Sequence, residues 1–178
     1  MDQQIKKTRC LNGDLNKIMT LISLYIIQGA AFGFFGMTLP VMMKQHFTYT
    51  EIGIISLCTM GFKFKFLFAF IVDTKYIDSI GKRKTWIIPS QIIAAIVMIY
   101  LGNNINSLID ERAIYTITGW FSLIFFALSI QDIAVDAWAL TIVKKENKSY
   151  ASVSQNVGLT IGAFLGNTGY FAFSSIDF

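Results

Sequence analysis

Charged side chains are scarce in this chain: only 15% of its 178 residues are Asp, Glu, Lys or Arg, whereas 54% are hydrophobic. A typical soluble domain carries about 25% charged residues. The single His46 has no acidic or cysteine neighbours that would complete a metal site. Cys10 lies in a polar tail and Cys58 in an apolar run, so we expect neither a disulfide nor a metal role. The composition predicts an all-α integral membrane protein.

Long apolar runs are what the sequence has in abundance. Crossing a hydrocarbon core of about 30 Å takes roughly 20 residues of helix. Five runs of about this length predict a polytopic transmembrane helix bundle, at residues 18–43, 52–72, 86–101, 113–143 and 151–174. Residues 1–17 form a polar tail with no cleavage site after it, and 175–178 follow the last run. Thr48 and Glu51 have the spacing of a capping box at the start of the second span.

Basic residues alternate between the two sides of the predicted bundle. One side holds eleven of them: Lys6, Lys7, Arg9, Lys17, Lys75, Lys82, Arg83, Lys84, Lys144, Lys145 and Lys148. The other side holds only Lys44 and Arg112. The positive-inside rule therefore predicts a cytosolic N-terminus, and the net charge of +4 does not call for a nucleic-acid partner. The glycosylation sequon at Asn147 falls on the cytosolic side, so we expect it to be unmodified.

Four ionisable residues fall inside the predicted spans: Lys63 and Lys65 in the second, Asp132 and Asp136 in the fourth. Such groups are costly in a bilayer and are kept mainly where they face protein or a watery path. Lys65 and Asp136 each lie about 12 Å from the cytosolic end of their span at 1.5 Å per residue. We hypothesise that Lys65 faces Asp136 or Asp132 between packed helices. The alternative is that these residues only fix helix packing, or that Lys63 extends to the interface.

Uncharged polar and small residues also recur within the spans. Polar candidates for substrate contacts, or for hydrogen bonds between helices, are Tyr25, Gln28, Trp138, Gln155 and Asn156. Small residues at a four-residue spacing are Gly29 and Gly33 in the first span, and Gly158, Gly162 and Gly166 in the fifth. This spacing predicts close helix packing, or a smooth surface in a rocking transporter.

The second loop begins with Asp73 and ends with Gly81, Lys82, Arg83 and Lys84. It resembles the major facilitator signature, in which an Asp and a Gly-Arg-Arg or Gly-Arg-Lys group join the second and third helices, although the spacing here is longer. The resemblance implies a cytosolic gate formed by Asp73 and Arg83. Ordinary positive-inside charge is the alternative explanation.

Several longer runs resemble the acetyl-CoA transporter family of the major facilitator class. They are LYIIQG at 24–29, the segment from Lys65 to Asp73, GKRKTWIIPSQ at 81–91, QDIAVDAWALT at 131–141 and SYASVSQNVGLTIGAFLGN at 149–167. The run at 131–141 is the most specific, because it combines two acids within a span with a Trp and Ala-Leu-Thr in fixed order. Bacterial muropeptide permeases share a looser form of the pattern.

The resemblance implies a carrier that exchanges cytosolic acetyl-CoA into the lumen of the endoplasmic reticulum by alternating access, with acetyl-CoA or CoA as its substrate. It implies neither catalysis nor a cofactor, and it places Lys65, Asp132 and Asp136 at substrate or gating contacts. The family has about twelve spans in two halves. We therefore expect this chain to be an N-terminal fragment that needs the missing half or a second subunit.

Two other functional classes remain open. One is a permease for another large anionic solute such as a muropeptide, and the other is a non-transporting scaffold or regulatory fragment. An intramembrane aspartyl hydrolase is disfavoured because both acids lie on one predicted helix and neither a Tyr-Asp nor a Gly-x-Gly-Asp motif is present.

Overall fold

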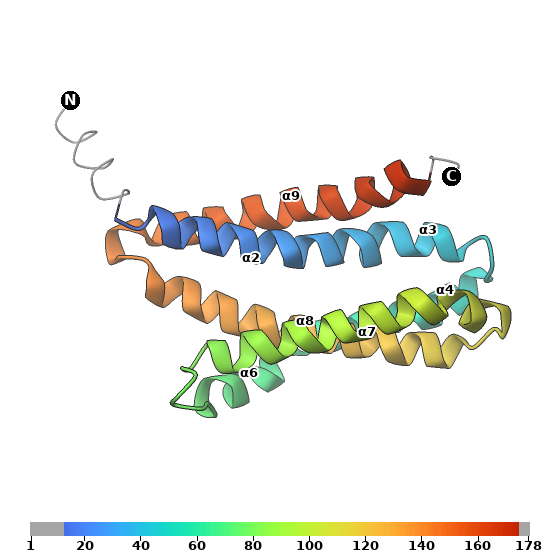
Figure 1. Ribbon diagram of the computed structural model, residues 1–178, viewed down its shortest axis with the longest axis horizontal. Coiled ribbons are helices and arrows are strands. Elements are labelled where there is room, and N and C mark those ends of the chain that lie inside the picture. The colour runs from blue at the N-terminus through green and yellow to red at the C-terminus, as the bar shows by residue number, and fades with distance from the viewer. Residues whose placement is uncertain (1–12, 175–178) are drawn as a thin grey trace. The chain divides into compact units, whose positions relative to one another are not determined.

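The computed structural model describes residues 13–174, and this range is helical with no strand (Figure 1). Most of the predicted tail, including Cys10, and residues 175–178 lie outside the described residues. The described chain divides into two units, one of residues 13–39 with 136–174 and one of Pro40–Val135. The predicted polytopic helical bundle is confirmed as an all-helical fold.

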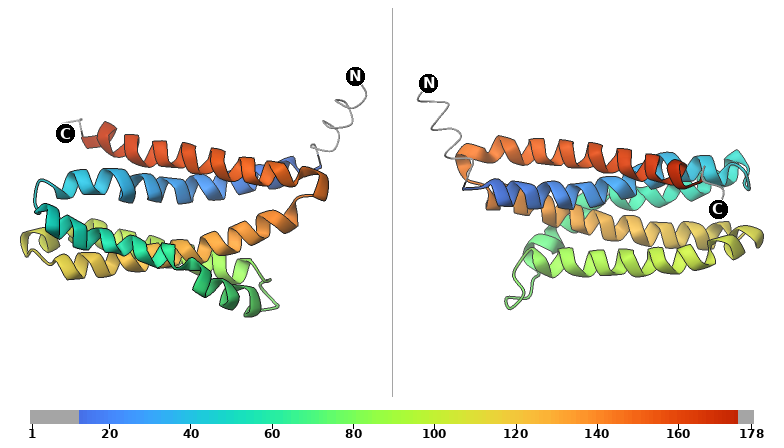
Figure 2. Two further views of the ribbon diagram at one scale, coloured as in Figure 1. Left: turned by 180° about the vertical axis from the view of Figure 1, so that it is seen from behind. Right: turned by 45° about the horizontal axis from the view of Figure 1, so that its top comes forward.

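The first unit is built on two long helices, α2 (Leu15–Gly33) and α9 (Lys148–Ser174). A π-helical segment, η1 (Phe34–Thr38), continues α2 toward α3 (Leu39–Met43), of which only Leu39 belongs to this unit. The end of α8 (Ile114–Ile142) and the short η3 (Lys145–Asn147) complete the unit. All three views show α2 lying beside α9 (Figures 1 and 2).

Glycines form the contact surface between α2 and α9. A Cβ built on Gly29 would lie 2.5 Å from the Leu159 carbonyl oxygen, and one on Gly158 would lie 2.5 Å from the Tyr25 Cβ. The positions of Gly33, Gly162 and Gly166 leave even less room against the backbone of the facing helix. Small residues are therefore required here because the two backbones touch, which confirms the predicted packing role.

A polar cluster joins the start of α2 to the turn between α8 and α9. Asp14 is fully buried and accepts hydrogen bonds from the Asn147 side chain (3.0 Å), the backbone N–H of Lys144 (3.1 Å) and the Lys17 ammonium (3.0 Å). Lys17 also donates to the carbonyl of Ile142 at 3.0 Å. Asn147 Nδ2, the atom that a glycan would modify, is thus buried and engaged. This contact favours the prediction of an unmodified Asn147 independently of topology.

Replacing Asp14 with Asn is expected to lower thermal stability at neutral pH, and this effect should fade in acid. The side-chain hydrogen bond from Asn147, together with the Lys17 and Lys144 donors, lowers the pKa of Asp14 from 3.8 to about 2. Because the folded pKa is the lower one, the carboxylate stabilises the fold fully above pH 3.8, and this contribution is lost as the pH falls through about 2. Melting of purified wild type and Asp14→Asn in detergent between pH 7 and pH 2 measures the difference. A gap that stays constant down to pH 2 contradicts this assignment.

The second unit contains the four segments of the next apolar stretch, which are α4 (Tyr49–Ser56), η2 (Leu57–Thr59), α5 (Met60–Lys63) and α6 (Lys65–Thr74). It also contains α7 (Lys84–Asp110) and the first part of α8. Thr48 and Glu51 form the predicted capping box. Aromatic pairs join α8 to its neighbours: Phe126 packs against Phe68 of α6, and Trp120 against Tyr100 of α7.

Four helical stretches in residues 13–174 are long and apolar enough to cross a membrane: Leu15–Met43, Tyr49–Thr74, Lys84–Asp110 and Ile114–Ile142. The third extends nine residues past the predicted run, because the polar segment 102–110 continues the helix. The fifth predicted span coincides with α9. This helix is less apolar than the other four because it contains several Ser, Thr, Gln and Asn residues. That α9 crosses the membrane stays a prediction. Large apolar side chains such as Phe70, Ile99 and Phe164 are exposed, as the surface of a membrane protein requires.

Candidate functional site

The second membrane stretch is interrupted at Phe64, between the two lysines that it carries. Phe64 has φ −89° and ψ 14°, outside the helical region, and separates α5 from α6. The chain remains hydrogen-bonded across the break, since Phe64 N–H donates to Met60 at 3.1 Å and Leu67 N–H donates to Phe64 at 3.0 Å. Discontinuous helices in membrane carriers typically occur where substrate or ions bind. Gly61 lies three residues before the break, but neither glycine nor proline occurs at 62–66, and the sequence did not predict the break.

An ion pair joins α6 to α8 at this break. The Lys65 ammonium lies 2.5 Å from Oδ2 of Asp132. The Asp132 side chain is 3% exposed and the Lys65 side chain 39% exposed. Removing a carboxylate from water is costly, and the close Lys65 ammonium offsets this cost. The hypothesis that Lys65 faces one of the two aspartates is therefore confirmed for Asp132.

Asp136 lies one turn further along α8 and belongs to the first unit. Its Oδ1 accepts hydrogen bonds from the Tyr25 hydroxyl of α2 (2.8 Å) and from Nε2 of Gln155 on α9 (2.9 Å). Tyr25 is 1% exposed. The network connects three helices through one carboxylate, and it brings together three of the predicted site residues.

The other predicted polar residues are more scattered. Gln28 is buried on α2 and Trp138 half-buried on α8, whereas Asn156 is exposed on α9. Lys63 is also exposed, and it forms no ion pair or hydrogen bond with any residue of 13–174. The role of each in substrate contact stays a prediction.

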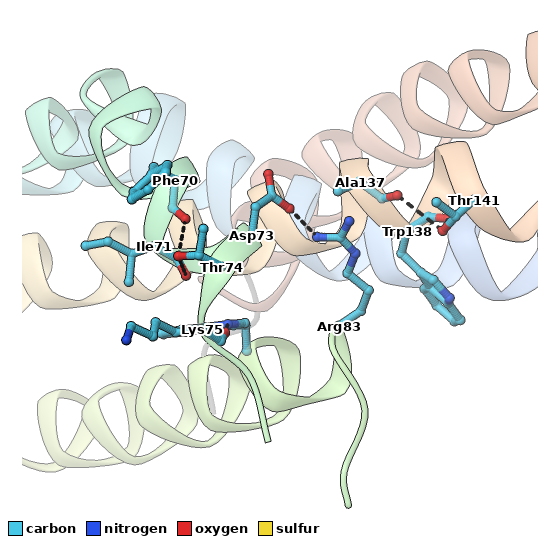
Figure 3. Close-up of polar contacts among 10 residues, drawn as sticks. Phe70, Ile71, Asp73, Thr74, Lys75, Arg83, Ala137, Trp138 and Thr141 are labelled. Atoms are coloured by element: carbon cyan, nitrogen blue, oxygen red, sulfur yellow. Dashed lines mark hydrogen bonds and ion pairs between the residues drawn. The ribbon is translucent and has the colours of Figure 1, made fainter. Parts of the chain in front are cut away.

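The second loop is folded around the predicted gate pair. Arg83 donates to Asp73 Oδ1 at 2.7 Å (Figure 3), which confirms the contact but not its function. Gly81 adopts φ +95°, a conformation that strongly favours glycine and turns the chain toward α7. The Trp86 indole donates to the Lys75 carbonyl at 2.7 Å and closes the loop. Lys82 and Lys84 are exposed beside the pair.

Replacing Arg83 with Gln is expected to lower the unfolding free energy by less than about 1 kcal/mol, because Asp73 is 48% exposed and such pairs are weak. Replacing Gly81 with Ala should cost more, about 1 to 2 kcal/mol, because it forces a side chain into a left-handed conformation. Thermal melting of both variants in detergent compares them. A larger loss for Arg83→Gln than for Gly81→Ala contradicts this ranking.

Comparison with known proteins identifies the family. The family model described as acetyl-coenzyme A transporter 1 matches residues 17–178, nearly the whole chain. The chain belongs to the acetyl-CoA transporter family. Its match includes both aspartates of α8, both lysines of the second stretch and the Asp73–Arg83 loop. The chain is thus a multi-pass membrane protein of a transporter family.

Individual relatives occur in three organisms. A Saccharomyces cerevisiae protein described only as a membrane protein is 35% identical over 100% of this chain and 35% of its own length. A Schizosaccharomyces pombe protein is 36% identical over 90% of the chain and 31% of its own length. A Rickettsia bellii protein that carries the name transporter AmpG 1 is 31% identical over 87% of the chain and 38% of its own length. The chain spans about a third of the length of these relatives, and no solved structure matches it significantly.

Other polar contacts of this family member were not foreseen. Thr38 in the π-helical segment donates to Asn167 of α9 at 3.0 Å. Gln131 is 2% exposed, and its Nε2 makes no hydrogen bond within the described residues. The Asp14 and Asn147 pair is separated by 133 positions. The sequence shows only that these residues are polar and lie inside or beside an apolar run. It does not show which residue each of them contacts.

Proposed function

We propose that this chain forms part of a carrier that moves acetyl-CoA across a membrane by alternating access. The family match over residues 17–178 is the observation that carries the proposal. The Lys65–Asp132 pair supports it, because a transporter keeps ionisable groups inside the bilayer where a stable scaffold would replace them with apolar packing. The protein acts as a carrier, not as an enzyme.

In this proposal the two carboxylates of α8 bind different helices. Asp132 holds α6 through Lys65, while Asp136 holds α2 and α9 through Tyr25 and Gln155. Each set of contacts ties neighbouring helices into a unit that moves as a body, as the rocking of repeats in secondary transporters requires. The Asp73–Arg83 pair would stabilise one of the two end states on the cytosolic side.

The working carrier contains more helices than this chain in our proposal, because the relatives are about three times as long. A major facilitator carrier binds its substrate between two six-helix halves. We place this chain in the N-terminal half, with the C-terminal half or a second subunit completing the cavity. The basic side of the bundle faces the cytosol, and acetyl-CoA passes into the lumen of the endoplasmic reticulum in exchange for CoA.

A second candidate is a permease for another large anionic solute such as a muropeptide. The looser resemblance of the sequence to bacterial muropeptide permeases favours it, and a bacterial relative with the name transporter AmpG 1 is 31% identical over 87% of the chain. Both candidates use the same charged helices, so only the cargo separates them.

Uptake into proteoliposomes tests the proposal. The longest reading frame that contains this chain is purified and reconstituted, and uptake of radiolabelled acetyl-CoA is measured with CoA inside the vesicles. We expect saturable uptake that internal CoA stimulates and that excess muropeptide does not inhibit. Uptake of muropeptide in place of acetyl-CoA would select the second candidate, and uptake of neither would leave a non-transporting protein.

A further inference from the structure

The two lysines of the interrupted second stretch have different surroundings. Lys65 begins α6 and is paired with Asp132. Lys63 ends α5, on the other side of the break at Phe64, and is exposed with no hydrogen bond or ion pair to residues 13–174. The same stretch therefore carries one cation that Asp132 neutralises and one that no residue of 13–174 neutralises.

Lys63 lies too deep in the membrane stretch to reach water by its own length. It is eleven residues before Thr74, the end of the stretch, which corresponds to about 16 Å at 1.5 Å per residue. Half of a hydrocarbon core is about 15 Å. A lysine stem of four carbons extends roughly 6 Å, so the ammonium cannot snorkel to the interface from this depth.

The surroundings of Lys63 exclude lipid as its normal environment. The neighbouring side chains Phe64, Phe66 and Leu67 are exposed and apolar, and they provide no acceptor. A lone ammonium among such groups in lipid costs several kcal/mol or more. Among residues 13–174 nothing neutralises Lys63, so it needs a water-filled path, an anion that enters that path, or an acid outside this range beside it.

We propose that Lys63 is the residue that binds the phosphate groups of the transported substrate, whereas Lys65 is a positioning residue held by Asp132. The proposal rests on the function proposed above, because acetyl-CoA carries phosphates at its nucleotide end. An ammonium without a fixed partner binds a phosphate without first breaking an ion pair, whereas Lys65 would have to leave Asp132 buried and unpaired. The break at Phe64 separates the two roles by ending one helix after Lys63 and beginning the next at Lys65.

Acetyl-CoA uptake kinetics of Lys63 variants test this assignment in the reconstituted protein. Lys63→Gln is expected to raise KM about tenfold, the loss of one charge-assisted contact, and to leave Vmax within about twofold. Lys63→Arg keeps the charge and should stay within about threefold of the wild-type KM. Lys75→Gln, which removes an exposed lysine outside the membrane stretch, is the matched control and should change neither parameter.

Several results would overturn the assignment. An unchanged KM for Lys63→Gln, or an equal rise for Lys63→Arg, shows that no phosphate contact is made there. A failure of Lys63→Gln to fold shows that the ammonium pairs with an acid elsewhere in the carrier. If the wild-type protein takes up no acetyl-CoA, the proposed function fails. The role of Lys63 is then tested by measuring whether adenosine 3′,5′-bisphosphate raises the melting temperature of the protein. Stabilisation of wild type that Lys63→Gln loses supports it, and equal or absent stabilisation overturns it.

Discussion

Replacing Asp132 with Ala is expected to destabilise the protein by about 3 kcal/mol and to reduce transport at least tenfold. The change leaves the Lys65 ammonium without the buried carboxylate that it contacts. Breaking a buried pair by removing one partner typically costs about 3 to 5 kcal/mol, and the partial exposure of Lys65 places this pair at the lower end. Thermal and denaturant unfolding of the purified protein, with acetyl-CoA uptake in parallel, measures both effects.

Two controls distinguish the effect of breaking the ion pair from the effect of removing a carboxylate as such. Asp110→Ala removes an exposed aspartate at the end of α7 that forms no ion pair in the described range, and it should change stability by less than about 0.5 kcal/mol. The double variant Lys65→Met with Asp132→Leu removes both charges and should be more stable than Asp132→Ala. If Asp132→Ala behaves like Asp110→Ala, the pair contributes nothing.

Replacing Gly162 with Ala is expected to cost about 3 kcal/mol and to lower the yield of folded protein. The new Cβ would overlap the carbonyl of Ile26 and lie 2.7 Å from the backbone N of Ala30, both on α2. Backbone atoms cannot move aside as a flexible side chain can, so α2 and α9 would have to separate and lose their contact. The melting temperature and the monodisperse fraction in detergent report the effect.

Gly169→Ala is the matched control on the same helix. A Cβ at Gly169 meets nothing within 4 Å, so alanine should be neutral or stabilise the helix by about 0.5 to 1 kcal/mol through its propensity. Equal melting temperatures for the two alanine variants would contradict the close approach of α2 and α9.

Features that depend on local spacing could be predicted from the sequence. Apolar length marked the membrane stretches, and the Thr48 and Glu51 spacing gave the capping box. The cost of charge inside a bilayer made a pairing of Lys65 with an aspartate of α8 predictable. The depth match was with Asp136, however, and the structure pairs Lys65 with Asp132, one turn away. The four-residue glycine spacing predicted close helix packing, but the structure was needed to show that the two glycine-bearing helices, α2 and α9, pack against each other.

Features that depend on three-dimensional neighbours could not be predicted. The break at Phe64 has no glycine or proline at the break itself, and Gly61 three residues earlier did not identify it, since it follows from φ and ψ angles that any residue adopts. Tyr25 and Gln155 were recognised as polar residues in spans, but their common partner Asp136 lies on a third helix. The extension of α7 to Asp110 passes through Gly102 and several asparagines, where local propensity is poor and the sequence predicted an end.

The central claim is that a lysine and an aspartate on neighbouring membrane helices hold each other in place. Exchanging the charges at positions 65 and 132 tests this claim most directly. Stability and uptake are compared for Lys65→Asp, Asp132→Lys and the double variant. The account predicts two unstable single variants and a double variant that regains most of the melting temperature and measurable acetyl-CoA uptake. A double variant no more stable than the single ones, at equal expression, would contradict it.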